Sequence, residues 1–296
     1  MAKHRAKFVQ DTIALVYDFD GTLSPQPMQE YTILPEIDID PKDFWEEVGK
    51  ESREQAEEHM LTYMRLLVEK TEKRDKHVGR SEFRRMGERV KYFVGVETWF
   101  DRINSFVHEN SGGRIRVHHY IISAGLKEIL EGVSIKKHFH NIFASEYHYG
   151  VHKQPTFPKL LITDTTKTQY LFRINKGKEQ LSESINSHMP HDLRPIPFEN
   201  IIYIGDGETD VPSMTVTRQE GGNAIAVYPE GRAQRQKKSL GVCKTLLDAE
   251  RVNFIAPANY SEGSILERRV HLLLRSVMAR IEYKRELFEC RRQFET

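Results

Sequence analysis

The chain has 296 residues, of which 44 are basic and 43 acidic, so its formal net charge is +1. This length suffices for a catalytic domain with an insertion, and the balanced charge provides no overall field that would favour nucleic acid or an anionic membrane as a partner. Its apolar runs are strand-sized, and its two cysteines are too few for a disulfide framework. We therefore expect no membrane-spanning helix and a cytoplasmic protein.

Two carboxylates follow the first predicted strand. The apolar stretch Thr12 to Tyr17 ends immediately before Asp18, and Asp20 comes two residues later. Because strand side chains alternate, both acids are expected on one side of the strand end, where they repel each other unless a cation or a shared proton intervenes. A divalent metal would leave one acid to act as nucleophile and metal ligand and the other to transfer a proton. For this motif alone, an acidic turn is the alternative interpretation.

Residues 25–95 differ in character from the rest of the chain. Three prolines come first, and three charged segments with helical patterns follow: Pro41 to Lys50, Arg53 to Lys70 and Ser81 to Lys91. No strand pattern is present here. We predict a helical cap domain at 25–95, inserted after the first strand of a catalytic core formed by residues 1–24 and 96–296.

From residue 96 onward, short apolar strands alternate with helices. The expected strands are Val117 to Ile122, Asn141 to Ser145, Ile201 to Ile204, Ala224 to Tyr228 and Phe254 to Pro257, with a hairpin ending in Gln169 to Phe172 and a helix from Lys176 to Ser187. This order predicts an α/β fold with a doubly wound parallel sheet, in which ligands bind at the carboxyl ends of the strands. Asp18, Ser123 and Asp206 each follow a predicted strand, so we expect them to converge on that edge.

Four short motifs occur in a characteristic order. They are Asp18 to Leu23, Ile121 to Gly125, Asn175 to Gly177 and Gly205 to Asp210. With these motifs the chain resembles the haloacid dehalogenase-like (HAD) hydrolase superfamily, and the matches extend from Asp18 to about Ser213. The resemblance implies a Rossmann-like core, and the helical insertion suggests a type-1 cap, as in phosphoserine phosphatase-like members.

The resemblance also implies catalytic roles. Asp18 is expected to attack phosphorus and form an aspartyl-phosphate, while Asp20 protonates the leaving oxygen and then activates water. An acid at position 20 favours phosphoryl chemistry over carbon–halogen chemistry. Ser123, with Ala124 and the amides that follow, is expected to bind the phosphate, although an ordinary helix-capping serine is the alternative. Lys176 is expected to neutralise the phosphoryl oxygens.

Other acids and lysines compete for some of these roles. Lys159 and Lys178 are rivals of Lys176. The expected cofactor is Mg²⁺, held by Asp18 and Asp206 together with the backbone carbonyl of Asp20. Asp210 is expected either to bind the metal through water or to orient the lysine, and Glu208 is a weaker candidate for the metal.

The C-terminal segment Ser264 to Phe294 is predicted to be one long helix. Its apolar stripe is Leu266, Val270, Leu273, Val277, Ile281 and Phe288. Because acidic residues interleave with the arginines, docking on the domain or against a second copy in a homodimer is favoured over nucleic-acid binding.

We expect the protein to hydrolyse a small phosphorylated metabolite and to take its specificity from the cap. The alternatives are a phosphotransferase or mutase that uses the same intermediate, and a regulatory or binding protein that keeps the fold without turnover.

Overall fold

The computed structural model describes residues 7–76, 78–231 and 234–294. Within these residues a seven-stranded sheet has the order β4-β3-β2-β1-β5-β6-β7, and all neighbouring strands are parallel except β3 and β4. The strands are β1 (Thr12–Tyr17), β2 (Arg116–Leu126), β3 (Phe139–Tyr149), β4 (Pro155–Leu160), β5 (Ile201–Gly205), β6 (Asn223–Tyr228) and β7 (Phe254–Pro257). The parallel α/β sheet expected from the sequence is thus confirmed.

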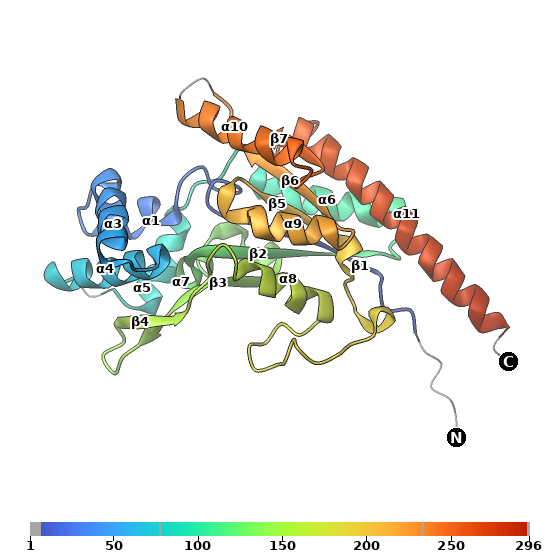
Figure 1. Cartoon of the computed structure of the whole chain (residues 1–296), viewed down its shortest axis with the longest axis horizontal. Helices are drawn as coiled ribbons and strands as arrows, with labels where there is room; N and C mark the ends of the chain where they lie inside the picture. Colours follow the sequence, from blue (N-terminus) through green and yellow to red (C-terminus); the bar gives the residue numbers. More distant parts are fainter. Residues whose placement is uncertain (1–6, 77, 232–233, 295–296) are drawn as a thin grey trace.

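Helices cover both faces of the sheet (Figure 1). On one face lie α6 (Val96–Ser111) and α11 (Ile265–Gln293), and on the other lie α8 (Lys167–Lys176), α9 (Val211–Gln219) and α10 (Gln234–Asp248). Short helical segments link the layers: α7 (Lys127–Leu130), η2 (Ser134–His138), η3 (His191–Leu193), η4 (Phe198–Asn200) and η5 (Glu208–Asp210). None of the described helices has the length and apolar character of a membrane span.

Strand β1 is the centre of this arrangement. Its side chains alternate between the two layers: Ile13, Leu15 and Tyr17 pack with α6, whereas Ala14 and Val16 face the other core. All five are fully buried. Because each buried aliphatic side chain stabilises the fold by about 1.5–3 kcal/mol, this short strand holds both layers in place.

Between residues 25 and 95 the described chain contains helices and no strand of the main sheet. These helices are α1 (Met28–Tyr31), α2 (Ile33–Glu36), α3 (Pro41–Gln55), α4 (His59–Lys73), α5 (Arg80–Met86) and η1 (Gly87–Arg89). They lie together at one end of the molecule (Figure 1). Their apolar side chains, such as Phe44 and Leu67, belong to the same continuous core as β1. The helical character agrees with the expected cap, and its status as a separate domain stays a prediction.

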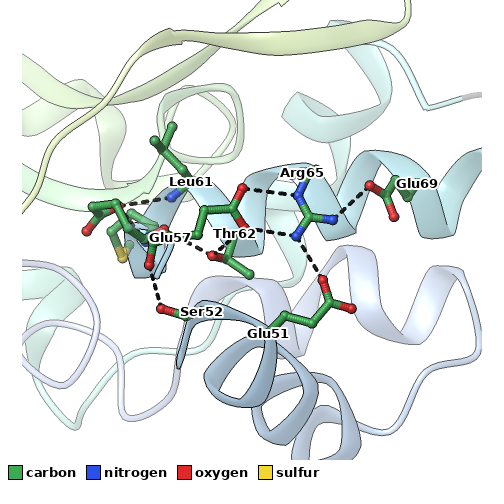
Figure 2. A network of polar contacts seen from close by, with 9 residues as sticks. Glu51, Ser52, Glu57, Leu61, Thr62, Arg65 and Glu69 are labelled. Atoms are coloured by element: carbon green, nitrogen blue, oxygen red, sulfur yellow. Dashed lines mark hydrogen bonds and ion pairs between the residues drawn. The ribbon is translucent and has the colours of Figure 1, made fainter. Parts of the chain in front are cut away.

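One arginine holds the two long cap helices together (Figure 2). The Arg65 guanidinium on α4 forms ion pairs with Glu51 of α3 at 2.8 Å, with Glu57 of the connecting loop at 2.9 Å, and with Glu69 at 2.9 Å. Thr62 donates a further hydrogen bond to Glu57. The arrangement fixes the turn between α3 and α4.

The structure corrects two local predictions. Gln169 to Phe172 lies inside helix α8, and the hairpin is formed instead by β3 and β4. Residues 177–190 contain no helix, although the sequence predicted one from Lys176 to Ser187. Tyr170, Leu171 and Ile174 are buried at helical spacing, so packing against the sheet decides the structure of this segment.

The Arg65 network gives a stability prediction. Arg65→Met is expected to lower the free energy of unfolding by about 1 kcal/mol, because three carboxylates lose their shared cation while their partial exposure screens the loss. Urea denaturation measures the change. Arg53→Met, an exposed position on α3, is the matched control. Equal stability of the two variants would contradict the role given to Arg65.

Candidate active site

Asp18 lies at the carboxyl end of the central strand and is almost fully buried. Its backbone N–H donates to the carbonyl of Ile204 at the end of β5, at 3.0 Å. Its carboxylate accepts from the Lys167 ammonium at 2.8 Å, and 5 % of the residue is exposed. The side chain that sequence reasoning selected as nucleophile is therefore held rigidly between two strands and beside a cation.

Lys167, the first residue of α8, is the cation of this site. Its Nζ lies 2.8 Å from Asp18 Oδ1 and 2.8 Å from Asp210 Oδ1, and 1 % of the residue is exposed. Burial by itself lowers the pKa of a lysine, but the two carboxylates outweigh this effect and raise the pKa of Lys167 well above its usual value. The structure thus places the Lys167 ammonium in the core between two carboxylates, which favour its charged form.

This position corrects the assignment of Lys176. Lys176 is the last residue of α8, and its Nζ donates to the carbonyls of Ile185 and Ser187. Nine residues of helix separate it from Lys167, a rise of about 14 Å, so it lies far from Asp18. The available signal was the run Thr163-Asp164-Thr165-Thr166, whose hydroxyl and carboxyl side chains are typical of a helix start and precede Lys167.

The other two lysines considered at the sequence level also lie outside the site. Lys159 pairs with Glu146 on the β3–β4 hairpin, and Lys178 donates to the carbonyl of Ser184.

Asp210 holds Lys167 in place. Its Oδ1 accepts from Lys167 and from the hydroxyl of Tyr203 at 2.7 Å, while its Oδ2 accepts from the backbone N–H of Asp206 at 3.2 Å. Of the two roles open for Asp210 in the sequence, this geometry supports orientation of a lysine, and that lysine is Lys167.

Asp206 lies against the turn that follows Asp20. Gly21 has φ +83°, and a Cβ there would lie 2.1 Å from Asp206 Oδ2, so glycine alone leaves room for this carboxylate. Asp18, Asp206 and Asp210 each offer an oxygen within 4.8 Å of the others. Because both Asp210 oxygens already accept hydrogen bonds, Asp18 and Asp206 are the side chains best placed to hold a metal ion.

The charge of this cluster calls for a cation. Burial raises the pKa of Asp18 to about 6, although Lys167 opposes the shift. Burial and the neighbouring charge of Asp18 raise the pKa of both Asp20 and Asp206 well above the usual value. One lysine does not neutralise four acids. Mg²⁺ prefers a few carboxylate oxygens together with water and substrate oxygens, so the donor set fits this ion.

The motifs of Asp20 and Ser123 both approach Met28. The backbone N–H of Met28 donates to Asp20 Oδ1 at 2.9 Å, which fixes this carboxyl at the start of the cap. Ser123 is 1 % exposed, and its Oγ accepts from the N–H of Gly125 at 3.0 Å. A Cβ on Gly125 would lie 2.1 Å from the terminal methyl carbon of Met28, so the Met28 side chain packs directly against Gly125. Met28 thus contacts both the motif of Asp20 and the motif of Ser123.

The local structure around Ser123 differs from the expectation. Strand β2 continues through Ser123 and Ala124 to Leu126, with an irregular register after Ser123, and only a four-residue helix follows. The pairing of Tyr17 with Ile121 places Ser123 beside the turn that contains Asp20. For Glu208 the backbone lies in η5, and its side chain is outside the described residues.

Two helices of the segment 25–95 contribute residues near the site. The backbone N–H of Met28, the first residue of α1, donates to Asp20. Tyr63 of α4 is fully buried, and its pKa is raised first by burial and further by the charges of Asp20 and Glu128. Helices α1 and α4 therefore contribute to the surroundings of Asp20, and the closing of a cap over the site stays a prediction.

Comparisons with known proteins show which chains and folds this protein is similar to. A protein of Borreliella burgdorferi that is described as uncharacterized is 30 % identical over 290 residues, covering 87 % of this chain and 94 % of the relative. Two solved structures share the fold. A probable phosphoserine phosphatase of Vibrio cholerae has a TM-score of 0.56 at 12 % sequence identity, and the match covers 93 % of this chain and 68 % of the Vibrio chain.

A HAD family hydrolase of Salmonella enterica serovar Typhi has a TM-score of 0.54 at 15 % sequence identity, and the match covers 84 % of this chain and 67 % of the Salmonella chain. The model of the family described as haloacid dehalogenase-like hydrolase matches residues 15–215, which include Asp18, Ser123, Lys167 and Asp206. The chain therefore belongs to the haloacid dehalogenase-like hydrolase family.

Proposed function

We propose that the protein is a Mg²⁺-dependent phosphatase that hydrolyses a small phosphorylated metabolite through an aspartyl-phosphate on Asp18. The observation that carries this proposal is the buried Asp18 carboxylate, which is paired with Lys167 and lies beside Asp206. Phosphoryl transfer requires mainly alignment and neutralisation of charge, and this cluster can supply both.

In the first step the Asp18 carboxylate attacks phosphorus, and the bond from phosphorus to the ester oxygen breaks. Asp20 gives its proton to the departing oxygen, and the raised pKa of Asp20 favours the protonated form that this step needs. In the second step Asp20 takes a proton from water, and the water oxygen attacks phosphorus. The bond between phosphorus and the Asp18 oxygen breaks, which releases phosphate and regenerates the Asp18 carboxylate.

Two groups are placed to bind the phosphoryl oxygens. A lysine ammonium has three N–H donors, and Lys167 uses two of them for Asp18 and Asp210, which leaves one for the substrate. Ser123 Oγ accepts a hydrogen bond from Gly125, so its own proton is free to donate to phosphate. In this proposal Lys167 takes the role that sequence reasoning gave to Lys176.

The carboxylates of Asp18 and Asp206 would hold Mg²⁺, with the backbone carbonyl of Asp20 as a further ligand. When bound, Mg²⁺ neutralises the charge of these acids and of the transferred phosphoryl group.

The closed cap supports a small substrate. Asp18 and Ser123 are almost completely buried, so the cap helices must move before a phosphorylated metabolite can enter and must return to exclude water. Specificity is then expected from residues 25–95. A cytoplasmic location stays a prediction.

The nucleophile is tested by Asp18→Asn. The amide keeps the shape of the side chain but cannot attack phosphorus, so we expect phosphate release from a panel of phosphorylated metabolites to fall by about 1000-fold or more. The same panel with an added alcohol acceptor separates hydrolysis from phosphotransfer. Substantial turnover by purified Asp18→Asn protein would refute the covalent mechanism.

The two lysines provide a matched pair. Lys167→Met leaves Asp18 and Asp210 buried without their cation, so we expect a loss of stability of about 3–5 kcal/mol and a fall in kcat of about 100-fold or more. Lys176→Met is expected to change both quantities little, because its ammonium contacts backbone carbonyls near the surface. Kinetics and urea unfolding measure both variants. A larger kinetic effect of Lys176→Met would restore the original assignment.

The metal site is tested by binding as well as by activity. Asp206→Asn is expected to weaken Mg²⁺ binding by about tenfold or more in calorimetric titration, because it removes one of two anionic ligands. Exposed Glu88→Gln is the control. Chelator is expected to abolish hydrolysis, and Ca²⁺ is expected to replace Mg²⁺ poorly. Full activity in excess chelator would argue against the proposed cofactor.

A further inference from the structure

The apolar stripe recognised in the C-terminal helix is used within the chain itself. The buried members of this stripe, which belong to the main core, are Leu266, Val270, Leu273, Val277 and Ile281. Phe288 packs at a tilt against Phe8, with ring centroids 5.9 Å apart. Figure 1 shows α11 along one side of the molecule, with its C-terminal turns extending past the sheet. This stripe therefore docks on the domain and is not available to a partner.

A second stripe runs along the opposite side of α11. We call it the outer stripe, and it consists of Ile265, Leu272, Ser276, Ala279, Tyr283, Leu287, Cys290 and Phe294. Leu272, Tyr283 and Phe294 are 57 %, 68 % and 82 % exposed. The members recur at intervals of three, four or seven residues, the spacing of a seam between two helices. Nothing in the described chain covers these side chains.

The charges beside the outer stripe indicate which partner fits. One flank carries Arg268, Arg275, Glu282 and Glu289, each seven residues after the one before. Two basic residues are thus followed by two acidic ones along a single line on the helix. In an antiparallel pair, the basic half of each flank lies beside the acidic half of the same flank on the other copy. The flank is therefore complementary in charge to itself.

This antiparallel pairing results when a two-fold axis passes between Ser276 and Ala279. Arg268 and Arg275 of one copy then face Glu289 and Glu282 of the other, and each contact occurs twice. A parallel pair gives no such match, because Arg275 then faces Arg280 across the seam.

The same register also matches the apolar positions. Leu272 of one copy faces Tyr283 of the other, and Ile265 faces Cys290. Ser276 and Ala279 meet at the two-fold axis, where their small side chains allow the helices to approach closely.

We propose that two copies of this chain associate back to back through the outer stripes of antiparallel α11 helices. The body of each copy lies on the inner side of its own α11, so the two bodies point away from each other. Glu282 already pairs with Arg114 at 3.0 Å, but 40 % of its side chain stays exposed, so the carboxylate is accessible to Arg275 of the second copy. The proposal is independent of the catalytic mechanism.

Sedimentation of the purified full chain tests the surface. The wild type is expected to be a dimer at micromolar concentration, and the double variant Leu272→Asp/Tyr283→Asp is expected to raise the dimer Kd by about 100-fold or more. Leu193→Asp is the matched control and should remain dimeric, because Leu193 is 59 % exposed at the end of η3, away from α11 in the sequence. A wild type that is monomeric up to about 100 μM, or a double variant that dimerises as the wild type does, would overturn the proposal.

Disulfide trapping tests the orientation. In the antiparallel pair the two native Cys290 residues lie about 38 Å apart, so oxidation should not link them, whereas Ile265→Cys should form a disulfide with Cys290 of the second copy. The buried Cys243 does not interfere. Peptide mapping that shows a link between the two Cys290 residues, or no link in the Ile265→Cys protein, would refute the antiparallel register.

Charge exchange tests the flank. Glu289→Arg should weaken dimerisation by about tenfold, and adding Arg268→Glu in the same chain should restore it, because the swapped charges meet again in the antiparallel pair. Failure of the second substitution to restore the dimer would contradict the pairing. Activity per protomer in these variants should equal that of the wild type, which keeps the result separate from the proposed phosphatase mechanism.

Discussion

The ion pairs of Lys167 with Asp18 and Asp210 are the interaction on which the rest of the site depends. Three charged groups from β1, the start of α8 and the turn after β5 meet in the interior, where an unpaired charge would be very costly. The lysine pairs with two of the acids but offsets only one negative charge, which leaves a negative environment around Asp206. This residual charge is what makes a divalent cation a fitting component of the site.

The backbone makes that cluster possible. The parallel alignment of β1 with β2 and β5 brings three strand ends to one edge of the sheet, and the hydrogen bond from Asp18 to Ile204 holds two of them in register. Gly21 then allows the Asp206 carboxylate to lie directly against the first turn. The carboxylates are thus positioned by strands and a tight turn, which are more rigid supports than a surface loop.

The helices of residues 25–95 and helix α11 differ in their contacts with the rest of the protein. The helices of residues 25–95 begin with Met28, which donates to Asp20, and the Arg65 network maintains the turn between α3 and α4 without touching the site. Helix α11 stabilises the far layer of the sheet with one face and presents its other face to solvent. A conformational change of the cap during turnover would therefore leave the proposed dimer surface undisturbed.

The sequence by itself determined the six parallel strands, because buried parallel strands appear as short apolar runs, and it missed the antiparallel strand β4. It selected Asp18, Asp20, Ser123 and Asp206, because each follows such a run. It did not identify Lys167. A lysine leaves no periodic pattern, and the threonine-rich segment around it favours a hairpin by its composition, whereas Tyr170 and Ile174 pack against the sheet from a helix.

Tertiary structure alone also decided the role of Asp210 and the use of each face of α11. Hydrogen bonds from Tyr203 and Asp206 occupy Asp210, and neither is visible in the spacing of the residues. Both faces of α11 carry apolar residues at helical intervals, and only the position of the sheet determines which face is buried. Local periodicity specifies an element, whereas the partner that covers it depends on contacts distant in sequence.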